Sequence, residues 1–134
     1  MGHLGLGGKE FQIPGFGIAD LIWVCAPVRN KKEPHVIAFE MKLSEWRRAL
    51  SQAYRYRYFA DRAIVVLPSE RVKLAKEALN IFKELQVGLW AFDPKTGVVD
   101  RLYTPRLARP KSLLARSRAI ALIDRKLDFS KFRK

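Results

Sequence analysis

An apolar run at residues 35–42 is followed by a helical pattern and then by a second apolar run at residues 63–67. Between the two runs, apolar residues recur at helical spacing from Ser44, a residue type that caps helices, to about Phe59. Two strands that are joined by a helix lie parallel in one sheet. This feature constrains the chain most, because it predicts a sheet that is at least partly parallel and is covered by a helix.

The other segments predict further strands on both sides of this unit. Residues 17–28 form an apolar run that a short polar turn joins to residues 35–42, and strands with so short a link are most simply antiparallel neighbours. A second helix is expected over about residues 70–86, from its apolar spacing. The last two strands are expected at residues 88–92 and 98–103, joined by the turn signal at residues 93–97.

The length of 134 residues fits a single domain that can bury a sizeable core. The order of elements predicts an α/β fold with a central mixed sheet flanked by helices. Residues 1–10 are rich in glycine and are expected to form a flexible arm. Residues 11–105 would form the core, and residues 106–134 a basic tail that is partly helical.

The chain is strongly basic, with 26 Lys and Arg against 13 Asp and Glu and a net charge of +13. Such an excess favours a polyanionic partner, nucleic acid first and an anionic membrane surface second, over a merely soluble basic protein. We expect DNA as the partner and no membrane partner, since no segment has the length and apolarity of a membrane span. The single cysteine, Cys25, excludes an intrachain disulfide and favours a reducing, cytoplasmic compartment.

Three charged residues are expected to converge at the carboxyl end of the 35–42 strand. Glu40 and Lys42 share one face of an extended chain, whereas Met41 between them is expected in the core. Asp20 lies near the start of the antiparallel neighbour, so it can reach Glu40. Two converging carboxylates repel each other unless a cation lies between them, and their oxygens favour Mg²⁺ or Mn²⁺. Alternatively, Glu40 and Lys42 are an ordinary exposed pair on a strand.

These residues lie in three short segments. The segments are Gly17-Ile18-Ala19-Asp20, Ala38-Phe39-Glu40-Met41-Lys42-Leu43-Ser44 and Gln52-Ala53-Tyr54-Arg55-Tyr56. Together they resemble the PD-(D/E)xK nuclease superfamily, which includes restriction-endonuclease-like and archaeal Holliday-junction-resolvase-like domains. The resemblance covers roughly residues 15–105. It implies a restriction-endonuclease-like three-layer fold and a deoxyribonuclease that depends on Mg²⁺ or Mn²⁺.

The resemblance also assigns roles by position. The residues with implied catalytic roles are Asp20, Glu40, Lys42 and Gln52. The implied metal ligands are Asp20, Glu40 and the backbone carbonyl of Met41. A metal in such a site would lower the pKa of a bound water, and Lys42 would hold that water or steady the phosphate, which suits phosphodiester hydrolysis.

Gln52 and Tyr56 match a Q-x-x-x-Y element that some members carry on the following helix. Their i, i+4 spacing places both on one helix face, although the same spacing fits a polar helix surface with a core tyrosine. Two positions depart from the family pattern. Ala19 stands where proline is usual, and the acid that many members carry upstream is represented only by Glu10, in the glycine-rich segment. Glu10 is therefore an additional candidate acid.

The predicted helix from Ser44 carries basic and aromatic residues that suit contacts with a phosphate backbone. The candidates for nucleic-acid binding are Arg47, Arg48, Arg55, Tyr56 and Arg57. Arginine binds phosphate as a planar fork, and exposed aromatic rings stack on bases. In the alternative, the arginines form a solvated face and the aromatic rings pack inward. The sequence has no helix-turn-helix or zinc signature, so recognition of DNA structure is favoured over recognition of its sequence.

The leading hypothesis is therefore a metal-dependent nuclease that hydrolyses DNA, with endonuclease and exonuclease action both open. The first alternative is a catalytically impaired nucleic-acid-binding module of the same fold. The second is a basic regulatory or structural protein in which the acidic and basic residues at 40 and 42 coincide by chance. Related nucleases often act as homodimers, and the sequence identifies no surface for such a contact.

Overall fold

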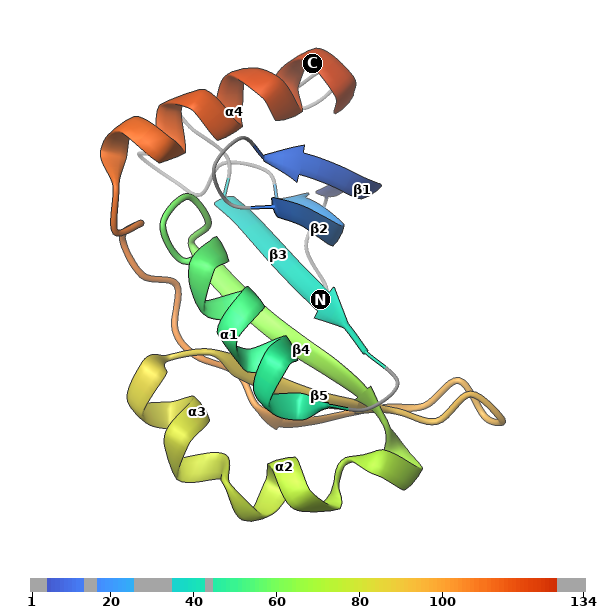
Figure 1. Cartoon of the computed structure of the whole chain (residues 1–134). Helices are drawn as coiled ribbons and strands as arrows, with labels where there is room; N and C mark the ends of the chain where they lie inside the picture. The colour runs from blue at the N-terminus through green and yellow to red at the C-terminus, as the bar shows by residue number, and fades with distance from the viewer. Residues whose placement is uncertain (1–4, 14–16, 26–34, 43–44, 128–134) are drawn as a thin grey trace.

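The computed structural model describes residues 5–13, 17–25, 35–42 and 45–127. These residues form one six-stranded sheet with helices packed against it (Figure 1). The strands are β1 (Gly5–Ile13), β2 (Gly17–Cys25), β3 (His35–Met41), β4 (Arg62–Pro68), β5 (Gly88–Phe92) and β6 (Val99–Tyr103). The helices are α1 (Trp46–Tyr56), the 3₁₀ helix η1 (Ser69–Arg71), α2 (Lys73–Glu77), α3 (Leu79–Leu85) and α4 (Leu113–Leu127). In the described part of the chain, no helix combines the length and apolarity needed to cross a membrane.

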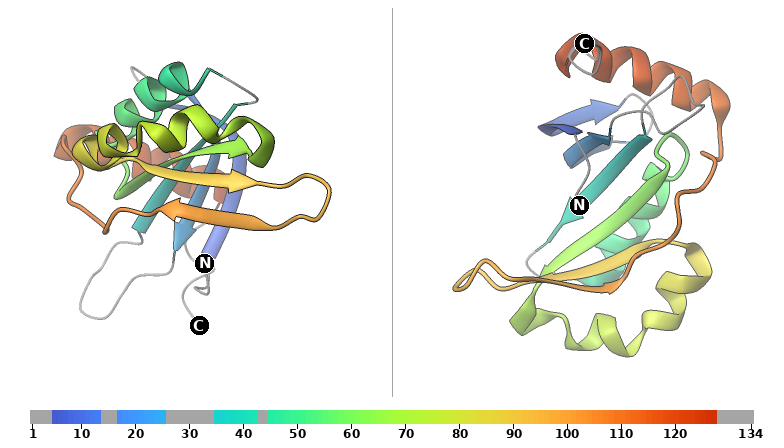
Figure 2. Two further views of the ribbon diagram at one scale, coloured as in Figure 1. Left: turned by 90° about the horizontal axis from the view of Figure 1, so that it is seen from below. Right: turned by 180° about the vertical axis from the view of Figure 1, so that it is seen from behind.

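The strands lie in chain order across the sheet, from β1 at one edge to β6 at the other. Strands β3, β4 and β5 run parallel, and the pairs β1–β2, β2–β3 and β5–β6 are antiparallel. The expected antiparallel pair before α1 and the parallel crossover around it are both confirmed. The fold is therefore α/β with a mixed sheet, and the β5–β6 hairpin projects beyond its neighbours (Figure 2).

Two apolar clusters fill the core, one on each face of the sheet. The larger cluster joins Ile22, Ala38 and Val65 of the sheet to buried side chains from all of α1 to α4. The members of the smaller cluster are Ile37, Phe39, Ile64 and Trp90. Because successive residues of a strand point to opposite faces, Glu40 lies on the same face as Ala38, beneath the helices.

Helix α1 approaches this face closely because the middle of its inward side is small and apolar. Ala49 and Ala53 are fully buried, and the last residue of the helix, Tyr56, is fully buried as well. Tyr54, which apolar spacing places on the buried stripe, is only half-buried. The helix begins after Glu45, and the expected cap one residue earlier lies outside the described residues. The rotation of α1 therefore directs Tyr56, rather than Tyr54, towards the sheet.

The expected flexible arm is wrong for residues 5–10, which belong to strand β1. This strand pairs with β2 along its length. Glycine at position 7 is explained by packing, because a Cβ there would lie 2.8 Å from the ring carbon Cε3 of Trp23. The glycine allows an aromatic ring to lie across the strand pair, and it does not indicate mobility. Residues 1–4 lie outside the described part of the chain.

The helix expected over residues 70–86 is divided into η1, α2 and α3. The break between α2 and α3 is at Ala78, whose φ of −99° and ψ of 21° depart from helical values. Ala75 before the break and Phe82 after it are both fully buried. The apolar spacing therefore continues through the break, and for this reason the spacing did not reveal it.

Helix α4 attaches the basic tail to the sheet through a buried ion pair. Arg116 Nη1 lies 2.6 Å from Asp61 Oδ2 and also donates to the carbonyl of Phe59 at 3.2 Å. The same Asp61 oxygen accepts the backbone N–H of Val36, at the start of β3, at 2.7 Å. The pair therefore fixes α4 against the beginning of the strand whose other end carries Glu40.

Candidate active site

Glu40 occupies the last buried position of β3. Its residue is 3% exposed and lies on the face that α1 covers. The next residue on the same face is Lys42, just beyond the end of the strand, and its Nζ lies 3.3 Å from Glu40 Oε2. The Lys42 side chain is 45% exposed. A buried acid thus has a charged partner that extends into solvent.

Asp20 lies beside Glu40 because of the register between β2 and β3. Leu21 pairs with Phe39 in this antiparallel ladder, so Asp20 lies one position further on, at the level of Glu40. Asp20 Oδ2 accepts the backbone N–H of Met41 at 2.8 Å. In an extended strand the carbonyl of a residue faces the same neighbour as its N–H, so the Met41 carbonyl also faces the β2 side. Asp20 and the backbone of Met41 are therefore in contact beside Glu40, at the carboxyl end of β3.

Gln52 and Tyr56 of α1 reach the same site from above the sheet. The Tyr56 hydroxyl donates to Glu40 Oε1 at 2.7 Å, and Gln52 Nε2 donates to the Tyr56 hydroxyl at 3.2 Å. The i, i+4 spacing thus aligns both side chains towards Glu40. Tyr56 is fully buried, so the expectation that it contacts nucleic acid directly is wrong. Its ring fills the core and its hydroxyl holds the acid.

Opposing influences act on the charge of Glu40. Burial raises the pKa of the Glu40 carboxyl above its ordinary value and is the largest influence, while the hydrogen bond from Tyr56 lowers this pKa. The negative charge of Asp20 raises the pKa again, and the positive charge of Lys42 lowers it. Burial and the bond to Glu40 raise the pKa of the Tyr56 hydroxyl, so this group remains a proton donor at neutral pH. A further cation near Glu40 would stabilise the ionised form of its carboxyl.

The donor set fits a hard divalent cation that keeps several waters. Asp20 and Glu40 supply carboxylates and Met41 a carbonyl, and Mg²⁺ commonly takes one or two carboxylates with water and substrate oxygens. In the described part of the chain, no three His, Cys, Asp or Glu residues gather closely enough to hold a metal. The pairs Lys9–Leu21 and Phe11–Ala19 flank Glu10 and Asp20, so the backbone of Glu10 lies in β1 opposite Asp20. The side chain of Glu10 lies outside the described residues.

The arginines expected to bind nucleic acid have different surroundings along α1. Arg47 and Arg48 are exposed, with Arg47 stacked on the Trp46 ring and Arg48 3.4 Å from a Glu45 oxygen. Arg55 is exposed in the last turn of the helix. Arg57 is half-buried and donates to the carbonyl of Leu85 at 3.0 Å. Arg57 thus holds α1 to the end of α3, whereas the other three face solvent.

Met41 and Phe92 were not identified as surface residues from the sequence. Met41, expected in the core, is 50% exposed, and Phe92 at the end of β5 is 38% exposed. With Lys42, Val66, Leu67 and Pro68 they line a hollow of about 170 Å³ at the carboxyl ends of β3, β4 and β5. The position of Phe92 just before the 93–97 turn was the available signal, because residues at strand ends lose the cover of neighbouring elements.

Comparisons with protein-family models, curated proteins and solved structures gave no match to this chain. The interpretation of the site therefore depends on its own geometry. That geometry brings together Asp20, Glu40, Lys42, Gln52 and Tyr56.

Proposed function

We propose that this chain is a Mg²⁺- or Mn²⁺-dependent nuclease that hydrolyses phosphodiester bonds of DNA. The observation that carries the proposal is the convergence of Asp20, Glu40 and Lys42 at the carboxyl end of β3. Two carboxylates beside a single lysine leave surplus negative charge at a partly buried position, which is unfavourable for a purely structural site. A bound divalent cation would remove this surplus, and the chain's net charge of +13 would attract a polyanionic substrate.

Each residue has a distinct role in this proposal. Asp20 and Glu40 would hold the cation, which would supply positive charge opposite the phosphate and favour the ionised form of an attacking water. Lys42, with its partly exposed ammonium group, would orient that water or stabilise negative charge that develops on the phosphate. Tyr56 and Gln52 are positioning residues, because their hydrogen-bonded chain fixes one Glu40 oxygen and keeps the other directed to Lys42.

The proposal includes a restriction-endonuclease-like arrangement of the sheet and its helices. The parallel crossover from β3 through α1 to β4, with the acids at the carboxyl end of β3, supports this finer assignment. The substrate surface would include Arg47, Arg48 and Arg55, which are exposed on α1. If these arginines contact phosphates, they carry no sequence information, and we expect the DNA's structure, rather than its sequence, to be recognised.

The decisive experiment is cleavage of labelled duplex, single-stranded and branched DNA in Mn²⁺. We expect the wild-type chain to cleave at least one substrate and a chelator to stop the reaction. Glu40→Gln and Lys42→Met should each lower the rate at least about 100-fold, as expected for groups that stabilise the transition state. Glu84→Gln, which changes an exposed acid on α3, is the matched control and should keep the wild-type rate. Metal-dependent cleavage that persists in both site variants would refute the assignment.

A DNA-binding module without turnover is the second candidate. The contacts of Glu40 favour this candidate, because both of its carboxylate oxygens already have partners within the chain. One oxygen accepts a hydrogen bond from Tyr56, and the other lies near Lys42. A module of this kind would bind DNA with an affinity that falls steeply with salt, and it would not cleave in either cation. If the chain neither cleaves nor binds DNA, a basic regulatory or structural protein is the remaining interpretation.

A further inference from the structure

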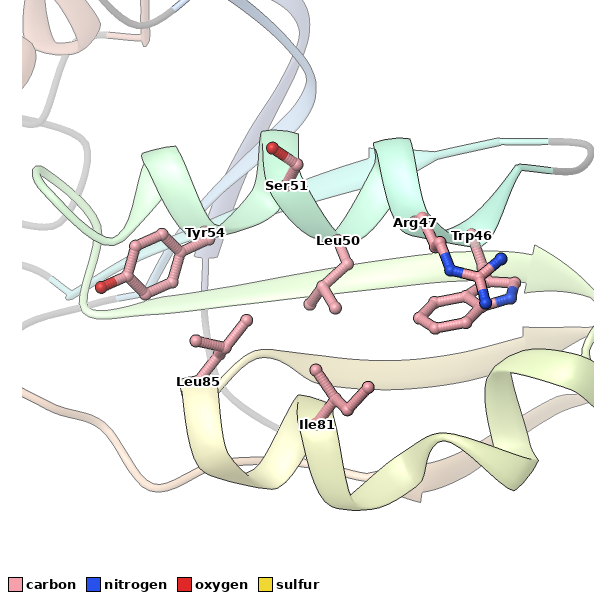
Figure 3. A pocket seen from close by; sticks show the side chains of 7 residues that line it. All are labelled: Trp46, Arg47, Leu50, Ser51, Tyr54, Ile81 and Leu85. Atoms are coloured by element: carbon pink, nitrogen blue, oxygen red, sulfur yellow. The ribbon is translucent and has the colours of Figure 1, made fainter.

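A groove runs between α1 and α3 (Figure 3). Its volume is about 350 Å³, and its lining residues are Trp46, Arg47, Leu50, Ser51, Tyr54, Ile81 and Leu85. In Figure 3, Leu50 of α1 faces Ile81 and Leu85 of α3 across the groove. Tyr54 lies at one end and Trp46 with Arg47 at the other. None of these residues belongs to the Asp20–Glu40–Lys42 site, and only Arg47 also belongs to the proposed substrate surface on α1.

A cation lies over an aromatic ring at each end of this groove. The guanidinium carbon of Arg47 is 4.7 Å from the centroid of the Trp46 ring, and Lys111 Nζ is 5.3 Å from the centroid of the Tyr54 ring. Arg47 and Tyr54 are seven residues apart on α1, which corresponds to roughly 10 Å along the helix. The described lining residues include no carboxylate. The groove therefore has a largely apolar floor, with Arg47 in its lining at one end and Lys111 beside the lining residue Tyr54 at the other.

The floor favours aliphatic side chains over nucleic-acid bases. Trp46 is 9% exposed, and its ring contacts both the guanidinium group of Arg47 and the ring of Phe82, whose centroid is 5.8 Å from that of Trp46. Base stacking needs an open aromatic face, and Trp46 does not offer one. The remaining floor is formed by leucine and isoleucine, and Ile81 is 38% exposed. Such a floor accepts leucine-like side chains from a partner.

We propose that this groove binds an acidic amphipathic helix of a partner protein. Helices that dock in grooves present side chains at positions i, i+3, i+4 and i+7. A carboxylate at i would pair with Arg47 and another at i+7 with Lys111, because two helical turns match the spacing of the groove's ends. Aliphatic side chains at i+3 and i+4 would lie on Leu50 and Ile81. The net charge of +13 would also speed the encounter with an acidic partner. The inference goes beyond the nuclease proposal and does not depend on it.

The probe is a synthetic fluorescent helical peptide with Glu at i and i+7 and Leu at i+3 and i+4, titrated with the full chain by fluorescence anisotropy. We expect binding that a scrambled peptide of the same composition does not show. Arg47→Glu and Ile81→Asp should each weaken it about tenfold, through charge reversal and loss of apolar contact respectively. Arg48→Glu is the matched control, because Arg48 is the neighbouring exposed arginine, pairs with Glu45 and does not line the groove. It should change the affinity less than about twofold.

A charge exchange gives the sharpest result. A peptide with Lys in place of its first Glu should bind the Arg47→Glu variant with most of the affinity that the original peptide lost. A nonspecific attraction to a basic surface would not produce this recovery. Equal binding of the designed and scrambled peptides, or no recovery with the exchanged peptide, would overturn the proposal. Two further results would also overturn it. In the first, Ile81→Asp weakens the binding of a single-stranded oligonucleotide, which would assign the groove to nucleic acid. In the second, the wild-type chain sediments as a dimer and Ile81→Asp as a monomer, which would assign the groove to a second copy of the chain.

Discussion

Two acid–base pairs lie at opposite ends of β3, and their surroundings differ. Asp61 and Arg116 lie 2.6 Å apart with side chains 12% and 9% exposed. A backbone N–H donates to the same Asp61 oxygen, and a backbone carbonyl accepts from Arg116. Glu40 and Lys42 lie 3.3 Å apart, with side chains 4% and 45% exposed. Here a second carboxylate, Asp20, raises the pKa of Glu40.

The difference separates a structural ion pair from a candidate reactive site. At the Asp61 pair, one negative and one positive group are enclosed together, and backbone groups complete their hydrogen bonds. At the Glu40 pair, two acids face one lysine, and the lysine extends into solvent. An unbalanced charge near the surface marks a place where a ligand can supply what the protein lacks.

The largest expected effect is on stability, at the enclosed pair. Asp61→Asn leaves the Arg116 charge buried without its carboxylate, and we expect the free energy of unfolding to fall by about 3 kcal/mol. The corresponding change Glu40→Gln removes surplus charge, and we expect it to alter this free energy by less than about 1 kcal/mol. Urea denaturation followed by tryptophan fluorescence measures both. Equal losses of unfolding free energy in the two variants would contradict the comparison. The control is Arg118→Met, which changes an exposed cation on α4, the helix that carries Arg116.

The second effect concerns cation binding. Asp20→Asn keeps an oxygen that can accept the Met41 N–H but removes one of the two carboxylates. We expect Mn²⁺ affinity to fall at least about tenfold, and stability to stay the same or rise slightly, because repulsion with Glu40 is relieved. Isothermal titration calorimetry measures the affinity, with Asp100→Asn in the exposed part of β6 as the control. An unchanged Mn²⁺ affinity would show that Asp20 only supports the strand end.

The placement of Asp20 beside Glu40 could be predicted because it depends on local rules. Strand alternation fixes the face of Glu40, and a short link between strands fixes their direction. The role of Gly7 could not be predicted, because it depends on where the Trp23 ring lies on another strand. The Asp61–Arg116 pair joins residues that are 55 positions apart, and no local pattern connects them.

The choice between Tyr54 and Tyr56 shows another limit of sequence patterns. Helical spacing places Tyr54 on the buried stripe of α1, but the structure buries Tyr56 fully and Tyr54 only in part. The close approach of Ala49 and Ala53 sets the rotation of the helix and buries Tyr56. A tertiary contact thus converted a residue expected to touch substrate into one that holds Glu40.

A smaller effect is expected when the hydroxyl above Glu40 is removed. Tyr56→Phe keeps the buried ring but loses the hydrogen bond to Glu40 Oε1. Because that bond lowers the pKa of Glu40, its loss should raise this pKa and move Mn²⁺ binding to higher pH. The free energy of unfolding should fall by about 1 kcal/mol. Mn²⁺ affinity measured against pH tests this, with Tyr103→Phe as the control. If the pH midpoint does not move, Tyr56 serves only to fill the core.

The smallest expected effect is a pH dependence of stability that Glu40 alone produces. The pKa of Glu40 in the folded chain is raised above the ordinary value of 4.5. At pH values between 4.5 and this raised pKa, the folded state therefore binds more protons than the unfolded state. Stability contributed by Glu40 is therefore complete below pH 4.5 and falls as pH rises through that window, by at most about 1.4 kcal/mol per pH unit. Glu40→Gln should lack this decline, so the difference in unfolding free energy between wild type and variant should shrink or reverse across the window. Urea denaturation at a series of pH values measures it. Parallel stability profiles for wild type and variant would mean that Tyr56 and Lys42 lower the pKa of Glu40 as much as burial and Asp20 raise it. Glu40 would then be a balanced, structural acid, as Asp61 is in its pair with Arg116.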